Sequence, residues 1–450
     1  MQTVHIISRT SAYCRECQVM HDARIVRREN CIYGVLDCPV QKQEYLLSAN
    51  ADFFIQNRNR SFFSYIDRNR PVQKIYKKPY ATFLNLTFHC DAGCSICFAN
   101  AVYQEHPQFL SAEQLVVRLK RLKSRGIKTV SLFGGEPTLH PDILGIIRII
   151  KKTGMRAILV TNGYRLGRDP GFAKKVKRAG VWEVDIQFDT LDPAVHRLLR
   201  GDRPLSLKKR ALRNIVRAGI RLGIVTTVIR SNADELPGLL EYLAGLGPLL
   251  KRVMIQGAVN SGRFGIDDFE IIDRETILAG ICSAAIFHTT MHVNDFWPFP
   301  GIQPWGLYMH PDCTVVNVVV NTAKKTHTMK DLLRVPDVWK ALQSIAPGRT
   351  IQNRYIKPLL AVIRGLRYRA VIQLISIAIQ GLVFRRKQKI AMFVLAVESY
   401  ESARFQDIEK TDFCPTLQSL KDEDVCACIY NSRGKEYHAS RMSERARGEV

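Results

Sequence analysis

A regular alternation of short apolar runs with amphipathic stretches, between residues 76 and 300, is the feature that most restricts the fold of this chain. Six of these runs have the length and the β-branched content of strands. They cover residues 82–88, 129–133, 157–161, 184–188, 223–229 and 252–256. Their starts lie roughly 27 to 47 residues apart, which leaves room for one crossover helix between successive strands. The pattern predicts an α/β fold with a partial or complete barrel of six βα units, whose chemistry lies at the carboxyl ends of the strands.

The sequence divides into three zones. We expect a small N-terminal cysteine-rich metal module over residues 1–75, the α/β core over residues 76–300 and a mixed C-terminal region over residues 301–450. Of all residues, 46% are hydrophobic and 24% charged, which is ordinary for a globular protein and excludes a disordered or collagen-like chain. No apolar run reaches about 18 residues, so no membrane-spanning helix is expected. Because no charged-then-apolar leader follows Met1, we expect a cytoplasmic protein whose clustered cysteines bind metal rather than form disulfides.

Positive charge is concentrated in one part of the chain. The formal net charge is +25, and residues 338–397 contain eleven basic residues and no acidic residue. Such a local excess favours an anionic partner, either a membrane surface or a nucleic acid.

Three cysteines, Cys90, Cys94 and Cys97, directly follow the first expected strand. Three thiolates on one short loop can hold three irons of a [4Fe–4S] cluster and leave the fourth iron open to a ligand, as a catalytic cluster requires. A zinc loop and buried thiols are the alternatives. Zinc would need a fourth ligand nearby, and His89, which directly precedes Cys90, could supply it only with strain.

A glycine-rich turn, Gly134-Gly135-Glu136, ends the second expected strand. Glycines let a ligand approach the backbone, and the Glu136 carboxylate can accept hydrogen bonds from an ammonium group. Taken alone this turn is a weak signal. Together, the two motifs resemble the radical S-adenosylmethionine (SAM) superfamily, whose signature combines this cysteine spacing, an aromatic residue after the third cysteine (Phe98) and this turn.

The resemblance covers roughly residues 78 to 260 and implies a partial (βα)6 radical SAM barrel. It implies that Cys90, Cys94 and Cys97 bind a [4Fe–4S] cluster, that SAM chelates the open iron, and that a 5′-deoxyadenosyl radical abstracts hydrogen from an unactivated C–H bond. An electron donor such as ferredoxin or flavodoxin is implied as a partner. The implied SAM contacts lie at successive strand ends, at Gly134, Gly135, Glu136, Thr161, Asn162, Gln187, Asp189 and Gln256. Plain polar turns are the alternative for Asn162 and Gln187, and no further catalytic residue is assigned.

Further motifs resemble one branch of the superfamily, which contains archaeal tetraether lipid synthases and relatives described as pterin methylases. These motifs include Cys14-Arg-Glu-Cys17, Cys38-Pro39 and residues 294–300 and 309–313. Two further metal sites are expected, and free thiols are the alternative for the first of them. One is a rubredoxin-like iron or zinc at Cys14, Cys17, Cys31 and Cys38, and the other is an auxiliary [4Fe–4S] cluster at Cys313, Cys414, Cys426 and Cys428. The His-Gly that usually follows Cys-Pro-x in this branch is absent after Cys38, and Cys282 is interpreted as a core residue.

An apolar segment, residues 370–384, lies between Arg369 and Arg385 inside the basic part of the chain. As a helix it would reach about 22 Å, short of the ~30 Å hydrocarbon core of a bilayer. It is therefore expected either to lie in a membrane interface or to be a buried helix with solvated ends. Nucleic acid is not expected as a partner, because the basic part has few aromatic residues and no base-reading motif.

These observations lead to one expected function and two alternatives. We expect a radical SAM enzyme that acts on a membrane lipid chain by C–C coupling or a related modification, peripherally at the inner face of the membrane. The first alternative is a radical SAM methyltransferase or other modifying enzyme for a soluble substrate such as a pterin or a peptide. The second is a catalytically silent metal-binding protein that contacts partners through its basic residues.

Overall fold

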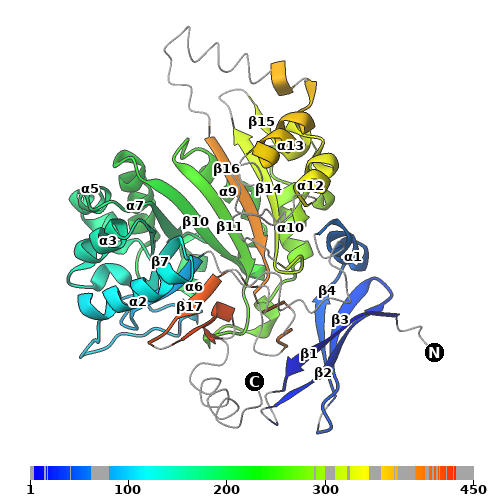
Figure 1. Cartoon of the computed structure of the whole chain (residues 1–450), viewed down its shortest axis with the longest axis horizontal. Coiled ribbons are helices and arrows are strands. Elements are labelled where there is room, and N and C mark those ends of the chain that lie inside the picture. The colour runs from blue at the N-terminus through cyan, green and yellow to red at the C-terminus, as the bar shows by residue number, and fades with distance from the viewer. Residues whose placement is uncertain are drawn as a thin grey trace.

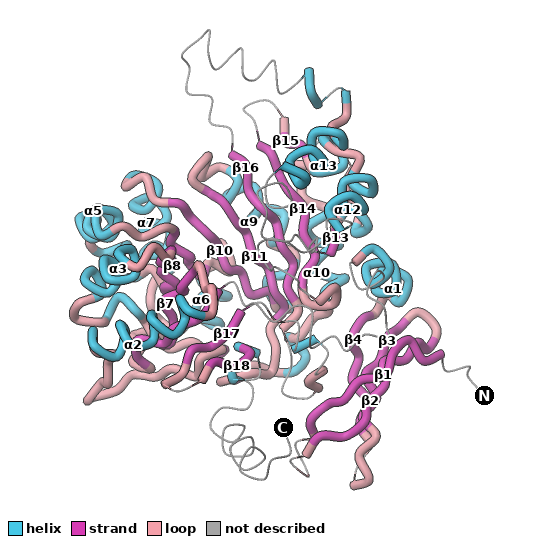
Figure 2. Tube along the Cα trace, viewed as in Figure 1, coloured by secondary structure: helices cyan, strands magenta, loops and turns pink. Residues whose placement is uncertain are grey.

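The computed structural model shows an open α/β sheet with a small β module beside it (Figures 1 and 2). The residues described are 5–14, 17, 19–40, 42–61, 81–287, 290–298, 310–321, 325–343, 356–368, 370–372, 391–400, 405–407, 410–411, 414, 416–421, 423–428 and 430–431. Most of the apolar segment 370–384 and the bases at 385–389 lie outside the described residues, so the helix expected there is not described.

All six expected strands are present, and the predicted α/β fold is confirmed. They are β5 (Ala81–Thr87), β7 (Thr129–Gly134), β8 (Arg156–Thr161), β9 (Glu183–Gln187), β10 (Arg221–Val228) and β11 (Leu250–Gly257). Neighbouring strands in this series are parallel and follow the order of the sequence. Parallel pairing in sequence order brings all six carboxyl ends to one edge, as a βα barrel requires.

Helices connect the strands and cover the outer face of the sheet (Figure 1). They are α2 (Ala112–Ser124), α3 (Ile143–Lys152), α4 (Tyr164–Arg168), α5 (Pro170–Ala179), α6 (Pro193–Arg200), α7 (Leu205–Arg217), α8 (Arg230–Ala233) and α9 (Leu236–Ala244). Several begin at residues that satisfy the free backbone N–H groups of the first turn. Ser111 and Gln114 form a capping box on α2, and the Asp142 side chain accepts from the Gly145 N–H on α3.

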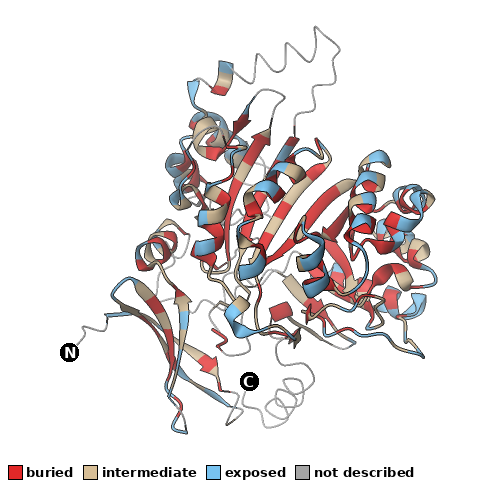
Figure 3. Ribbon diagram, turned by 180° about the vertical axis from the view of Figure 1, so that it is seen from behind, coloured by how far each residue is buried: buried red, intermediate tan, exposed pale blue. Residues whose placement is uncertain are grey.

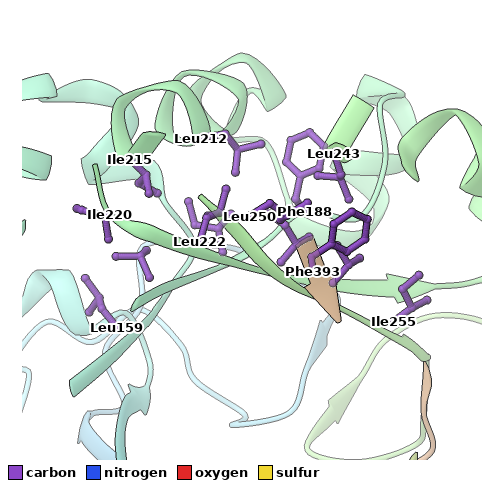
Figure 4. Close-up of a cluster of buried hydrophobic side chains, with 14 of the residues drawn as sticks. Leu159, Phe188, Leu212, Ile215, Ile220, Leu222, Leu243, Leu250, Ile255 and Phe393 are labelled. Atoms are coloured by element: carbon purple, nitrogen blue, oxygen red, sulfur yellow. The ribbon is translucent and has the colours of Figure 1, made fainter. Parts of the chain in front are cut away.

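The main core lies between these helices and the strands. It is formed by buried aliphatic and aromatic side chains such as Leu159, Leu222, Phe188 and Phe393 (Figure 4). The central strands are buried over most of their length, while the outer faces of the helices are exposed (Figure 3). Because both faces of the parallel strands are covered, their sequences read as nearly continuous apolar runs.

The C-terminal region extends this sheet at both edges. Next to β11 lie β16 (Ala391–Glu398), which is parallel to it, then the antiparallel β14 (Thr314–Asn321), β13 (Trp297–Pro298) and β15 (Thr326–His327). Next to β5 lie the parallel β17 (Thr416–Ser419) and the antiparallel β18 (Asp424–Cys426). Beside β14 and β16 lie α10 (Arg274–Cys282), α11 (Met329–Leu332), α12 (Val335–Gln343) and α13 (Lys357–Gly365). Within the described ranges β5 and β11 do not pair with each other, so the barrel is partial.

The N-terminal module is a four-stranded antiparallel sheet followed by one helix. Its elements are β1 (His5–Tyr13), β2 (Met20–Arg28), β3 (Cys31–Leu36), β4 (Gln43–Ser48) and α1 (Ala51–Arg60). Phe405, from the segment after β16, packs into the core of this module. A Cβ atom at Gly34 would lie 2.6 Å from the Phe405 ring, so only glycine accommodates that ring. The C-terminal region therefore helps to complete the N-terminal module.

We predict that Phe405→Ala destabilises the N-terminal module by about 3–5 kcal/mol, the usual cost of removing a buried phenylalanine ring. Chemical denaturation followed by circular dichroism would measure the change in the free energy of unfolding. The matched control is Phe269→Ala, because Phe269 is 67% exposed. Equal stability of the two variants would contradict the packing role of Phe405.

Candidate active site

A pocket lies at the carboxyl ends of the six parallel strands. It holds about 890 Å³ of space, part of which is open to solvent. Ten of the eleven residues predicted for the cluster and for SAM line it. They are Cys90, Cys94, Cys97, Gly134, Gly135, Glu136, Thr161, Asn162, Gln187 and Gln256. The structure therefore brings these residues together from strands that are far apart in the sequence.

The cysteine loop is held in place by the segment that follows β11. The short strand β6 (Ile96–Cys97) pairs with β12 (Arg263–Phe264), and the Arg263 Nε donates to the Cys94 carbonyl over 2.9 Å. Gly262 has a φ of +64°, and a Cβ atom there would overlap the Cys97 carbonyl. The loop is thus fixed by strand pairing and a side-chain hydrogen bond from a distant segment that has no recognisable motif.

The spacing of the three thiols bears on the choice between a cluster and zinc. Ligands of one tetrahedral zinc, with Zn–S bonds of about 2.3 Å, lie about 3.8 Å from one another. In the part of the chain that the structure describes, only Cys14, Cys17 and Cys38 place three ligand atoms within 4.8 Å of each other. The thiols of Cys90, Cys94 and Cys97 are more widely spread around the pocket, which fits ligands of separate irons better than ligands of one ion.

Burial raises the pKa of the Cys90 thiol, and the nearby Glu136 carboxylate adds to this effect. A thiol in this position ionises most readily with a cation bound to it. Arg200, at the end of α6, lies beside the Cys94 thiol and lines the same pocket. The cysteine loop therefore has a fixed positive charge next to one of its three thiols.

The Gly-Gly-Glu turn packs directly against the start of the cysteine loop. The Gly135 N–H donates to the Thr87 carbonyl over 2.7 Å, and the Glu136 N–H donates to the His89 carbonyl over 2.8 Å. A Cβ atom at Gly135 would overlap the His89 carbonyl, and Gly134 adopts a φ of +111°. Both glycines are thus needed for the close approach of two chain segments as well as for exposing the backbone to the pocket.

The Glu136 carboxylate is buried and satisfied within the protein. Its Oε1 accepts hydrogen bonds from the Thr138 N–H, the Thr138 hydroxyl and the Thr161 hydroxyl, and its Oε2 accepts from the Asn162 N–H over 2.7 Å. Burial raises the pKa of Glu136. The carboxylate therefore joins the turn after β7 to the turn after β8, and its expected contact with SAM stays a prediction.

Asp189 differs from the other predicted SAM contacts, because it is not among the pocket-lining residues. It is buried, and its carboxylate accepts two hydrogen bonds from the Arg200 guanidinium, at 2.7 and 2.8 Å, and one from the Thr227 N–H. These contacts lower the pKa of Asp189 in spite of its burial. Asp189 thus orients Arg200, which reaches the pocket in its place.

Two buried polar atoms of the pocket lining have no hydrogen-bond partner among the described residues. They are the Gln256 Oε1 and the Ser261 Oγ. An unpaired buried polar group is costly, so such atoms are typical of a site completed by a ligand. A polar adenosyl group with hydroxyl and amino donors matches this need.

The wall of the pocket beside Phe98 comes from the C-terminal region. Tyr400 follows β16, its ring centroid lies 5.2 Å from that of Phe98, and its hydroxyl donates to Glu398 over 2.8 Å. Burial raises the pKa of both Glu398 and Tyr400. Sequence motifs gave no role to Arg200 or Tyr400, because each reaches the pocket from outside the six strand-end turns.

The four cysteines expected to hold an auxiliary cluster lie near the edges of the sheet. Cys313 precedes β14 and Cys428 follows β18, and both thiols lie close enough to Tyr400 to affect its pKa. Burial raises the pKa of Cys313 to about 12. Cys414 donates to the Thr416 carbonyl, and Cys426 belongs to β18. The structure thus brings Cys313 and Cys428 to one side of the pocket, and the auxiliary cluster stays a prediction.

A second ligand group lies in the N-terminal module. The Sγ of Cys38 is 3.5 Å from that of Cys14 and 3.7 Å from that of Cys17, and the His21 Nε2 lies 2.9 Å from the Cys17 Sγ. These distances are close to those between ligands of one tetrahedral metal ion. Cys31 lies elsewhere, because it begins β3 whereas Cys38 follows the end of that strand, about 20 Å away for an extended chain. Three of the four expected cysteines, Cys14, Cys17 and Cys38, thus lie together with His21 beside Cys17, and the bound metal stays a prediction.

Comparisons with known proteins agree with this site. The family model described as the Radical SAM superfamily matches residues 84–243. A 7,8-dihydro-6-hydroxymethylpterin dimethyltransferase of Methanocaldococcus jannaschii is 26% identical over 237 residues, which are 49% of this chain and 44% of that protein. A probable GTP 3′,8-cyclase of Methanococcus maripaludis is 28% identical over 170 residues, which are 37% of this chain and 56% of that protein. The chain spans about half the length of the curated relatives it matches.

Among solved structures, Streptococcus suis SuiB bound to S-adenosylmethionine matches with a TM-score of 0.37 and 15% identity, over 54% of this chain and 65% of that chain. The family match begins on β5 and ends in α9, so it contains the cysteine loop, the Gly-Gly-Glu turn and the helix that carries Arg200. The cofactors of this family are a [4Fe–4S] cluster and SAM, as the sequence motifs predicted. The predicted resemblance is confirmed: this chain contains a radical SAM domain.

Proposed function

We propose that the protein is an enzyme that uses this pocket for radical SAM chemistry. When bound, the cluster and SAM supply a reductive cleavage that generates a 5′-deoxyadenosyl radical for hydrogen abstraction. The observation that supports the proposal best is the convergence of three cysteine thiols, the Gly-Gly-Glu turn and two unpaired polar atoms on one pocket. An electron donor such as ferredoxin or flavodoxin is proposed as the partner that supplies the electron.

The residues of the chain have separate tasks in this proposal. Cys90, Cys94 and Cys97 hold the cluster, and Arg200, oriented by Asp189, places a positive charge beside it. The Gln256 Oε1 accepts a hydrogen bond from the bound adenosyl group. Glu136 binds the two turns together, so that the pocket keeps its shape before any ligand arrives.

The Phe98 and Tyr400 rings line one wall of the pocket and exclude water from that side. Exclusion of water protects a reactive carbon radical from side reactions. Tyr400 comes from the C-terminal region, outside residues 84–243 that the family model matches.

For the substrate, we propose a hydrocarbon chain of a membrane lipid, modified by C–C coupling or a related reaction. The acid-free stretch 338–397 and the exposed apolar side chains of α13 support a site that receives substrate from a membrane. The second candidate is a soluble pterin, favoured by the similarity to the dimethyltransferase of M. jannaschii. A silent metal-binding protein is the third reading, and absence of SAM cleavage would favour it.

We predict that Cys94→Ala lowers 5′-deoxyadenosine formation, measured anaerobically with SAM and dithionite, by at least about 100-fold. Loss of an outer-shell partner of a ligand already costs about 10–100-fold, and Cys94 is proposed as a ligand itself. Cys282→Ala is the matched control, because Cys282 lies in α10 outside the pocket. Full activity of the Cys94 variant would contradict the proposal that this loop holds the cluster.

The N-terminal module is proposed to hold one iron or zinc ion through Cys14, Cys17, Cys38 and His21. We predict that His21→Ala lowers metal retention at least about tenfold, whereas Cys31→Ala retains it. Metal per chain would be measured by mass spectrometry, with the cysteines of the pocket loop and of the expected auxiliary cluster replaced so that only this site is counted. If Cys31→Ala loses the metal and His21→Ala retains it, the four cysteines would be the ligands and the role proposed for His21 would be wrong.

The two candidate substrates are separated by comparing extracts of cells with and without the protein, with the Cys94→Ala variant as control. Coupling of two chains joins two carbons and removes one hydrogen from each, and two 5′-deoxyadenosyl radicals, one from each of two SAM molecules, would take up these hydrogens as 5′-deoxyadenosine. We therefore expect new lipid species whose mass equals that of the uncoupled chains together minus two hydrogens for each bond formed. Unchanged lipids together with methylated pterins would favour the second candidate.

A further inference from the structure

Helix α13 turns its large apolar side chains away from the protein. Ile356, which directly precedes the helix, and Leu359, Leu360 and Ile363 are 46%, 60%, 41% and 50% exposed. At 100° per residue these four side chains share an arc of about 100°. A surface helix normally buries such a stripe, so its exposure indicates a surface that contacts something else. We call these four residues the α13 face.

The opposite side of the helix explains why this face cannot turn inward. Ala361 and Gly365 are buried there against α12. A Cβ atom at Gly365 would overlap the side chain of Val338, so the two helices approach closely through small residues. The Arg334 N–H also donates to the Gly365 carbonyl over 2.8 Å. The orientation of α13 is therefore fixed by packing, with its large residues outward.

The charged side chains that α13 itself carries are all basic. Lys357 and Arg364 are exposed and lie about 80–100° from Ile356 around the helix, so both flank the same side of the face. Arg367 follows the helix and is exposed as well. No acidic residue occurs between Asp337 and Glu398 in the sequence. An apolar stripe beside basic residues is complementary to an anionic membrane, in which apolar acyl chains lie beneath negatively charged headgroups.

We propose that the α13 face inserts into the boundary between headgroups and acyl chains of an anionic membrane. None of the described helices has the length and hydropathy of a membrane-spanning segment. The nine residues of α13 reach only about 14 Å, short of the ~30 Å hydrocarbon core, so we place this helix along the membrane surface. Tyr368, which is 80% exposed, continues the surface with a side chain that suits the membrane–water boundary. The inference deepens the proposed function by naming where substrate would be collected, and it is tested without turnover.

The test uses the full chain and two kinds of vesicles, phosphatidylcholine alone and phosphatidylcholine mixed with phosphatidylglycerol. In a flotation assay we expect binding to the anionic vesicles that weakens with salt. The substitutions Leu359→Ser, Leu360→Ser and Ile363→Ser together should lower the apparent affinity at least about tenfold. Val117→Ser on α2, where Val117 is 67% exposed, is the control and should bind as the unchanged protein does.

A second variant keeps the test decisive if the first one misfolds. Lys357→Gln with Arg364→Gln leaves the apolar stripe intact and should weaken binding to anionic vesicles while reducing its salt dependence. No vesicle binding by the unchanged protein, or equal binding by all variants, would overturn the proposal. A concentration-dependent dimer that the serine substitutions abolish, seen by light scattering, would instead assign the α13 face to a second copy. Vesicle binding that persists in Cys94→Ala would show that docking stands apart from the radical chemistry.

Discussion

The close contact between the ends of β5 and β7 is the constraint on which the rest of the site depends. Gly134 and Gly135 let the backbone of one turn reach the Thr87 and His89 carbonyls, immediately before Cys90. From the same turn, Glu136 reaches the end of β8 with hydrogen bonds to Thr161 and Asn162. Three neighbouring strand ends are thereby joined through buried polar contacts. A larger side chain at either glycine would separate them and displace the cysteine loop.

Buried charge extends this arrangement to the other half of the pocket. Asp189 follows the end of β9, accepts a hydrogen bond from the Thr227 N–H on β10 and holds Arg200 of α6 against the pocket. Removing either partner would leave an uncompensated buried charge, which is strongly destabilising. Asp189, which the sequence places among the SAM contacts, therefore acts on the pocket by holding Arg200 in place. Two buried carboxylates therefore preorganise the pocket. Glu136 does so through hydrogen bonds to neighbouring turns, and Asp189 through its ion pair with Arg200.

The C-terminal region takes part in both the sheet and the pocket. Because β16 pairs with β11 and β17 pairs with β5, it extends both ends of the parallel series without closing it. Tyr400 reaches the pocket from the end of β16, and Phe405, shortly after it, packs into the N-terminal module. The N-terminal module and the pocket are therefore connected through the C-terminal region, although the three lie in separate zones of the sequence.

The sequence alone determined the six strands, their order, the cysteine loop and ten of the residues that line the pocket. These features follow from local signals, since apolar periodicity marks the strands and parallel pairing brings the turns after them to one edge. Only the tertiary structure decided that Cys14, Cys17 and Cys38 come together with His21 beside Cys17, that Arg200 and Tyr400 enter the pocket, and that the large residues of α13 face outward. Each of these depends on contacts between segments distant in the chain. No local pattern encodes such a contact, because its energy arises only once the segments have packed together.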